Sequence, residues 1–172
     1  LNKFSKLIRK ILASTIEKET TLEEEIETIK LYVNIENIRF NNTIDFELTI
    51  DVSLNTTSIK IPSLITQPFI ENAIWHGLSL KKDNKKLTLN IQKLNESQLQ
   101  IDIIDNGIGR QKSTEIKKKK LLQRNSVGIS LSEERLEHFS KDYNSSSDIF
   151  LTDLYDNKTP IGTKVTILIP LL

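Results

Sequence analysis

The residues best suited to chemistry are Asp105, Gly107 and Gly109, which directly follow an apolar segment. Residues 98–104 alternate and then become wholly apolar, so Asp105 stands where a buried strand reaches the surface. The two glycines permit positive φ and a close approach of a ligand to the backbone, and the carboxylate can accept a hydrogen bond from an amino group. A plain Asn-Gly hairpin turn explains the same pattern, so both interpretations stay open.

A second polar group lies on a predicted helix, residues 67–77, whose apolar residues recur at helical spacing and which Gly77 ends. Asn72 and His76 are four residues apart and therefore share a face. The amide oxygen of Asn72 can ligate a hard cation such as Mg²⁺ together with substrate phosphates. For either residue alone the alternative is structural, namely an amide near a helix end and a core histidine bonded to backbone.

Two further segments place small residues at the start of a regular element. Residues 126–128, Ser-Val-Gly, open an amphipathic helix, whose free N–H groups and dipole favour an anion. Gly162 and Thr163 precede a predicted strand over residues 164–170, in which apolar residues alternate.

In chain order these motifs resemble the nucleotide-binding boxes of the histidine-kinase type of ATP-binding fold. The boxes are Glu71-Asn72-Ala73-x-x-His76-Gly77, Asp105-x-Gly107-x-Gly109, Gly128 and Gly162-Thr163. Other residues resemble the LytS/YehU-like class of sensor histidine kinases, whose partner regulators usually carry a LytTR DNA-binding domain. These residues are Leu22-x-x-Glu25, Tyr32, Ile35-Glu36, Arg39-Phe40, Ile61-Pro62, Gln67-Pro68 and Glu134-Arg135-Leu136. The resemblance covers about residues 4–170.

The resemblance implies an α+β fold, a two-layer α/β sandwich of the Bergerat type shared with gyrase and heat-shock chaperones. Residues 1–40 would end a helical dimerisation region, and residues 41–172 would form the ATP-binding catalytic domain with a lid at about 110–127. The phosphate-accepting histidine of this class lies upstream of the second helix in that region. We therefore expect it outside this chain, a C-terminal fragment whose only histidines are His76 and His138.

The resemblance also implies an activity, that of an ATP-dependent protein-histidine kinase with ATP and Mg²⁺ as cofactors. The γ-phosphoryl group would pass to a histidine outside the fragment for relay to a response regulator. Glu71 and Asn72 would act in catalysis, Glu71 as polarising or basic residue unless it only caps a neighbouring N–H, and Asn72 as the Mg²⁺ ligand. Asp105 would bind the adenine amino group. The other expected nucleotide contacts are His76, Gly107, Gly109, Lys112, Gly128 and Thr163.

Two residues depart from the family pattern. Trp75 stands where many relatives carry Lys, which removes a possible phosphate contact, and Ser126 replaces the usual first Gly of Gly-x-Gly, which restricts the backbone. These changes motivate an alternative function, a catalytically impaired nucleotide-binding or scaffolding module of the same fold. The cationic residues of the lid, Lys112 among them, would help to neutralise phosphate charge or would simply form a solvated face.

Composition limits the partners. The 172 residues, 37% of them hydrophobic, suffice for one core, and 24 Lys and Arg against 23 Asp and Glu give no field that favours direct binding of nucleic acid. No apolar run reaches the roughly 18 residues of a membrane span. By resemblance the partners are ATP, a second copy in the parent protein and a LytTR-type response regulator. The chain would be the cytoplasmic portion of a bacterial protein anchored in the inner membrane through its missing N-terminal part.

Periodicity predicts the elements that must position these residues. Helices are expected at residues 4–16 and 22–40, the second with a Thr21-x-x-Glu24 capping box and two buried faces. The helix that carries Asn72 is expected to start near Ser63 and to kink at Pro68. The predicted strands, in an antiparallel or mixed sheet with helices on one face, span residues 44–52, 58–61, 85–93, 98–104, 148–153 and 164–169.

Overall fold

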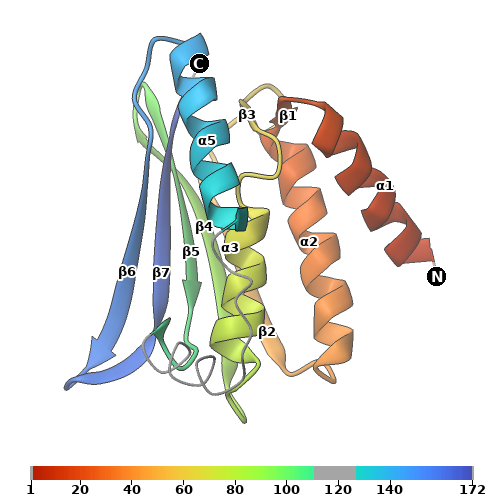
Figure 1. Cartoon of the computed structure of the whole chain (residues 1–172), viewed down its shortest axis with the longest axis vertical. Coiled ribbons are helices and arrows are strands. Elements are labelled where there is room, and N and C mark those ends of the chain that lie inside the picture. The colour runs from red at the N-terminus through yellow and green to blue at the C-terminus, as the bar shows by residue number, and fades with distance from the viewer. Residues whose placement is uncertain (1, 111–126, 172) are drawn as a thin grey trace.

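The computed structural model describes residues 2–110 and 127–171, which form a two-layer α/β sandwich and confirm the predicted fold class (Figure 1). One layer is a five-stranded sheet, and helices α5, α3 and α2 cover one face of it, with α1 outermost against α2. The elements are α1 Asn2–Ile16, β1 Glu19–Thr21, α2 Leu22–Arg39, β2 Ile44–Ile50, β3 Lys60–Pro62, α3 Gln67–Asn72, η1 Ala73–Leu78, β4 Lys85–Asn95, β5 Gln98–Asp105, α5 Val127–Asp142, β6 Asp148–Asp156 and β7 Thr159–Pro170.

The large sheet has the strand order β2-β4-β5-β7-β6 and is mixed. Only the β2–β4 pair is parallel, and the two expected hairpins, β4–β5 and β6–β7, are both present. At the second hairpin Asn157 and Lys158 have φ of 45° and 72°, the left-handed pair that a tight two-residue turn requires. Buried leucines and isoleucines of β4, β5 and β7 face the helices, and each stabilises the fold by roughly 1.5–3 kcal/mol.

Helix α2 begins at the predicted capping box. Thr21 Oγ1 accepts a hydrogen bond from Glu24 N at 3.2 Å, and Thr21 N donates to Glu24 Oε2 at 3.1 Å. The expectation of two buried faces is only half confirmed, because Ile38 is 58% exposed whereas one apolar row is fully packed. That row consists of Leu22, Ile26, Ile29 and Val33.

Strand β2 is shorter than predicted. It ends at Ile50, and Val52 is exposed, because Asp51 Oδ1 accepts a hydrogen bond from Ser53 N at 2.9 Å and turns the chain. Strand β3 likewise begins only at Lys60 and pairs with β1 instead of joining the large sheet.

The expected helix start near Ser63 is wrong. Leu64 is in the left-handed conformation with φ 58°, and α3 begins at Gln67, which leaves Pro68 in the first turn, where its missing N–H costs nothing. Instead of kinking, the helix widens into the π-helical turn η1, in which Ser79 N donates to Ile74 O at 2.8 Å. None of the described helices is both long and apolar enough to cross a lipid bilayer.

Candidate functional site

Asp105 is the last residue of β5, as its position after an apolar segment predicted. The sequence placed it where the strand reaches the surface, but the structure leaves it only 4% exposed. Its Oδ1 accepts a hydrogen bond from Gly107 N at 2.8 Å, and the Thr163 N–H also donates to the carboxylate. Burial raises the pKa of Asp105 to about 6, although these two hydrogen bonds and the charge of Lys81 lower it. A carboxyl group with such a pKa changes charge near neutral pH, which is typical of functional sites.

Three glycines from three segments surround Asp105: Gly77 and Gly162 pack against Asp105 itself, and Gly107 packs against Gly77. A Cβ added to Gly77 would lie 2.5 Å from Asp105 Oδ1, and a Cβ on Gly162 would overlap the Asp105 backbone oxygen. A Cβ on Gly107 would in turn overlap the backbone of Gly77. The end of η1, the turn after β5 and strand β7 therefore approach one another as closely as backbones can. We call Asp105 with Gly77, Gly107 and Gly162 the Asp105 cluster.

The turn beyond the cluster is fixed against the β6–β7 hairpin. Gly109 has φ 78°, and a Cβ there would lie 2.7 Å from the Pro160 side chain, so the predicted freedom of this glycine is used. Arg110 forms a bidentate ion pair with Asp153, with Nε and Nη2 at 2.7 and 2.8 Å from the carboxylate oxygens. Thr163, half-buried, is the register partner of both Asp105 and Asp153.

Sequence reasoning missed two residues at this end. Gly77 was expected to end a helix and belongs to the first of the motifs quoted above, but its close approach to the Asp105 carboxylate was not predicted. Lys81 follows η1, and its Nζ donates to Asn106 O at 2.7 Å while its charge acts on Asp105. Asn106 itself is structural, since its Oδ1 accepts from Lys86 N at 2.8 Å. The one local signal that could have indicated Lys81 is its position shortly after the predicted helix.

The helix made of α3 and η1 brings the polar residues of the second motif to the cluster. Glu71, Asn72 and His76 are all half-buried on it, and the residue after His76 is Gly77, which contacts Asp105. Glu71 Oε1 accepts a hydrogen bond from Gln67 Nε2 at 2.8 Å, which orients the carboxylate. A π-helical turn inside a helix is frequent at functional sites, and here it begins directly after Asn72 and contains Gly77 of the Asp105 cluster.

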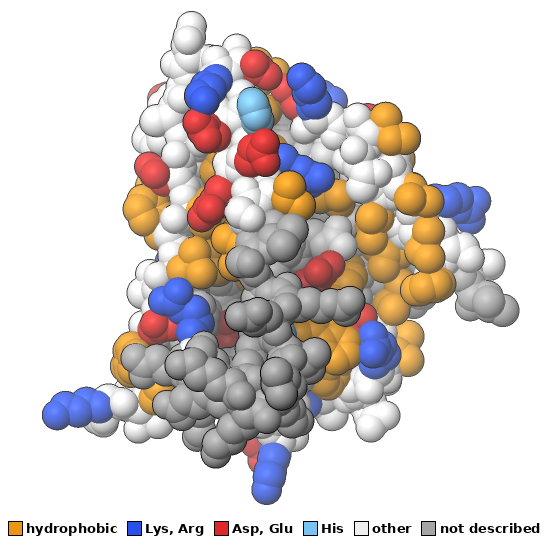
Figure 2. All heavy atoms as spheres, viewed as in Figure 1, with side chains coloured by type: hydrophobic (Ala, Val, Ile, Leu, Met, Phe, Trp, Pro, Cys, Tyr) orange, Lys and Arg blue, Asp and Glu red, His pale blue; other side chains and the backbone are white. Residues whose placement is uncertain are grey.

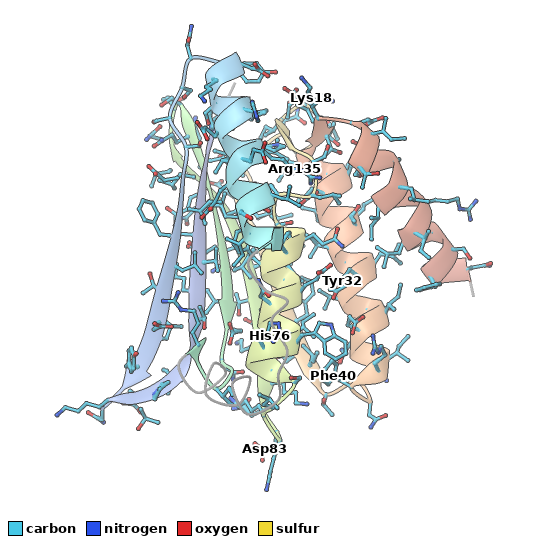
Figure 3. The ribbon with its side chains drawn as sticks, viewed as in Figure 1. Lys18, Tyr32, Phe40, His76, Asp83 and Arg135 are labelled. Carbon is cyan, nitrogen blue, oxygen red and sulfur yellow. The ribbon has the colours of Figure 1, made fainter. Side chains whose placement is uncertain are left out.

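Trp75, one of the two departures from the family pattern, packs toward α2. Its ring lies 5.7 Å from that of Phe40, and the Arg39 guanidinium stands 4.6 Å above it. Its side chain also forms a hydrogen bond with Tyr32, whose pKa burial raises. Figure 3 shows Tyr32 and Phe40 on the side of α2 that faces the helix of His76.

The remaining predicted residues are distributed as follows. Gly128 lies in the first turn of α5, and an added Cβ would meet Pro68 Cβ at an ordinary 3.4 Å. His138 is exposed beside Glu134, as expected of a surface position. Lys112, Ser126 and the predicted lid between residues 110 and 127 lie outside the described residues. Within the described part of the chain no three His, Cys, Asp or Glu residues could together hold a metal ion.

Comparison of the sequence with known proteins gives a consistent set of relatives. The family model described as Histidine kinase matches residues 1–44. The YwpD protein of Bacillus subtilis is 29% identical over 152 residues, which cover 88% of this chain and 50% of that protein. Sensor protein LytS of Oceanobacillus iheyensis is 35% identical over 109 residues, which cover 63% of this chain and 18% of LytS. The chain thus spans half or less of the length of these relatives.

Solved structures give the same fold. The histidine kinase domain of the blue-light activated kinase from Erythrobacter litoralis superposes with a TM-score of 0.58 at 17% identity, over 84% of this chain and 60% of that one. The histidine kinase ThkA, solved in complex with the response regulator TrrA, has a TM-score of 0.55 at 15% identity, over 99% of this chain and 48% of that one. The chain is therefore similar in sequence to the LytS-type sensor histidine kinases, and its fold is that of a histidine kinase catalytic domain.

Proposed function

We propose that this chain is the ATP-binding catalytic part of a two-component sensor histidine kinase. It would bind ATP with Mg²⁺ and transfer the γ-phosphoryl group to a histidine outside the chain, for relay to a response regulator. The observation that supports this best is the Asp105 cluster, a buried carboxylate held between backbones at the end of a sheet strand. The cluster would be the base end of the nucleotide site.

The chemistry of Asp105 suits an adenine ring. An ionised carboxylate offers about four acceptor positions, and the Gly107 and Thr163 N–H groups leave room for a further donor such as the adenine amino group. Because Gly77 and Gly107 have no side chains, their backbones can approach the Asp105 carboxylate closely, and neither residue places a side chain in the space beside it. Burial in this setting strengthens a hydrogen bond to a charged acceptor.

The phosphate end would consist of Glu71, Asn72 and Gly128. Asn72 supplies a neutral oxygen, which fits Mg²⁺ because this ion is usually bound by few protein oxygens together with phosphates. Bound ATP supplies the phosphoryl group, and Mg²⁺ neutralises its charge. Glu71, oriented by Gln67, would polarise the accepting imidazole or receive its proton. The protein contributes mainly positioning and electrostatics, as is usual for phosphoryl transfer.

The proposed partners follow from the same family relation. A second copy would pair through the N-terminal helices, since α1 carries exposed hydrophobic side chains four residues apart, visible along its outer side (Figure 2). These residues are Phe4, Ile8, Leu12 and Ile16. A LytTR-type response regulator would receive the phosphoryl group, and the parent protein would be anchored in the bacterial inner membrane with this part in the cytoplasm.

Titration calorimetry with a non-hydrolysable ATP analogue tests the nucleotide site. The unsubstituted chain should bind the analogue more tightly with Mg²⁺ than without it, and Asp105→Asn should weaken binding under both conditions. Absence of binding at millimolar analogue, or unchanged binding by Asp105→Asn, would refute the proposal. Incubation with ATP and a separately supplied acceptor segment then tests transfer, which should label the acceptor histidine.

A second candidate function is a nucleotide-sensing or scaffolding module that has lost transfer. It is favoured by Trp75, whose ring is committed to Arg39 and Phe40 on α2 at a position where many relatives carry Lys. This version predicts nucleotide binding without phosphorylation of the acceptor segment. Transfer at a rate that depends on Glu71 would eliminate it.

A further inference from the structure

A buried carboxylate on α2 reaches the loop that precedes α3. Glu25 is 3% exposed, and its partners lie about forty residues further along the chain. Glu25 Oε2 accepts from Leu64 N at 3.2 Å, and Oε1 accepts from Thr66 N at 3.0 Å and from Thr66 Oγ1 at 2.5 Å. A single side chain therefore binds three donors of one short turn.

The same turn is held from its other side by α5. Arg135 Nη1 donates to Ser63 O at 2.8 Å, and Figure 3 shows Arg135 on the part of α5 next to this loop. Burial raises the pKa of Glu25. The hydrogen bonds from Thr66 and Leu64 and the positive charge of Arg135 act in the opposite direction and lower this pKa. Residues 63–66 are thus clamped between a carboxylate from α2 and a guanidinium from α5.

The clamp fixes where α3 begins. Leu64 adopts φ 58°, a left-handed conformation that strains a non-glycine residue and persists only where surrounding contacts enforce it. Thr66 occupies the N-cap position of α3, yet its hydroxyl donates to Glu25 and caps no helix N–H. Two residues later, Pro68 lies beside Gly128 in the first turn of α5. The starts of α3 and α5 therefore meet next to the clamped turn.

Simple attachment of α2 does not require this arrangement. Leu22, Ile26 and Ile29 already bury one row of α2, and an apolar residue at position 25 would extend that burial without the cost of burying a charge. A carboxylate is needed only to satisfy the N–H groups of a turn in this particular conformation. The Glu25 carboxylate and the Arg135 guanidinium thus hold residues 63–66 in this conformation.

We propose that Glu25 and Arg135 are positioning residues for phosphate binding. They hold the first turn of α3 against the start of α5, so that Asn72 and Gly128 face the same phosphate groups. The Asp105 cluster belongs to the sheet and to the far end of η1, and its geometry does not depend on the clamp. The inference rests on the proposed function, since it assigns a task to residues around that nucleotide site.

The experiment compares Glu25→Gln with a matched control, Glu24→Gln. Glu24 is the preceding residue on α2, is exposed, and bonds only near the helix start. For each variant, calorimetry measures the affinity for adenosine and for the non-hydrolysable ATP analogue with and without Mg²⁺. We expect Glu25→Gln to keep the affinity for adenosine within about twofold. The factor by which Mg²⁺ strengthens binding of the ATP analogue should fall about tenfold, because the glutamine amide nitrogen cannot accept a hydrogen bond from the N–H groups of the turn. Glu24→Gln should leave both quantities unchanged.

If thermal melting shows that Glu25→Gln does not fold, the same calorimetric comparison is made with Arg135→Lys. Lysine keeps the charge but lacks the planar fork that reaches Ser63 O, so a smaller loss of the same kind is expected. Wild-type Mg²⁺ dependence in the folded variants, or an equal loss for adenosine and the ATP analogue, would overturn the inference. Failure of the unsubstituted chain to bind the analogue would instead refute the proposed function, and this inference with it.

Discussion

The base end and the phosphate end of the candidate site are built in different ways. At the base end, Gly77, Gly107 and Gly162 come from different elements and interlock around Asp105, with no space for a single added carbon. At the phosphate end, Glu71 and Asn72 are half-buried on one helix, and Pro68 in the first turn of that helix lies against Gly128 of α5. One end consists of backbone contacts at a sheet edge, and the other of side chains on two helices joined through a clamped turn.

Because the two ends are built differently, substitutions at them should affect the stability of the fold and the affinity for nucleotide to different degrees. Where backbones interlock, any substitution changes the fold and the site together, since interiors respond to even one added methyl group. Where half-buried side chains meet, function can change while the free energy of unfolding stays nearly constant. Substitutions at the two ends should therefore differ in their ratio of lost affinity to lost stability.

Gly162→Ala should give the largest effect. Its Cβ would overlap the Asp105 backbone oxygen, and its φ of 151° disfavours any residue with a Cβ. Because the obstacle is backbone of a central strand pair, we expect a loss of about 3 kcal/mol or more in the free energy of unfolding. Urea denaturation measures it. A loss below about 1 kcal/mol would mean that the strands can separate at little cost and that the base end is not rigid.

Asp105 should make stability fall as the pH rises. Its pKa is about 6 in the folded chain against an ordinary value of 3.8, so the folded state binds the proton more tightly. The contribution of Asp105 to the free energy of unfolding is fully present below pH 3.8 and is lost as the pH rises through about 6. The total loss is about 3 kcal/mol at most. Denaturation of Asp105→Asn at the same pH values isolates this contribution. A difference between the two proteins that does not change from pH 4 to 7 would contradict it.

Binding should depend on pH in the opposite direction. The ionised carboxylate is the stronger acceptor, so affinity for adenosine should rise with pH through about 6 and then level off. Adenosine is the suitable probe because it has no phosphate that titrates in this range. An affinity that is flat from pH 5 to 8 would show that Asp105 does not bind the base in its charged form.

The base end could be predicted from sequence because its signals are local. The strand period places Asp105 at the end of β5, and the spacing of Gly107 and Gly109 marks the turn, both as found. The roles of Gly77 and Lys81 were not predicted, because their contacts with the base end join segments that are distant in the sequence. The residues on either side of a glycine do not reveal which distant backbone it will contact.

The helix start was mispredicted for the same reason. Residues 63–66 suit the beginning of a helix by local pattern, and only the buried Glu25, far earlier in the chain, takes the N–H groups of Leu64 and Thr66. Tertiary hydrogen bonds overrode the local preference. The clamp itself joins α2, the loop and α5, so no single window of the sequence contains it.

Asn72→Ala should act on binding more than on stability. Alanine is favoured in a helix, and Asn72 is only half-buried, so the free energy of unfolding should change by less than about 1 kcal/mol. Loss of the amide oxygen should remove about tenfold of the Mg²⁺-dependent affinity for the ATP analogue, about 1.4 kcal/mol. Calorimetry beside urea denaturation measures both. A stability loss as large as that of Gly162→Ala would show that the two ends are not separable.

Gly128→Ala should give the smallest change in stability, with the opposite sign. It adds the same methyl group as Gly162→Ala, but the new Cβ meets Pro68 at an ordinary 3.4 Å, and alanine in a helix is favoured over glycine by up to about 1 kcal/mol. Affinity for the ATP analogue should nevertheless fall, since the methyl group would stand where the phosphates approach the start of α5. A variant that is more stable and binds more weakly would confirm that the phosphate end trades helix stability for access. If it were more stable with unchanged affinity, Gly128 would have no part in the site and the phosphates would lie elsewhere on α3.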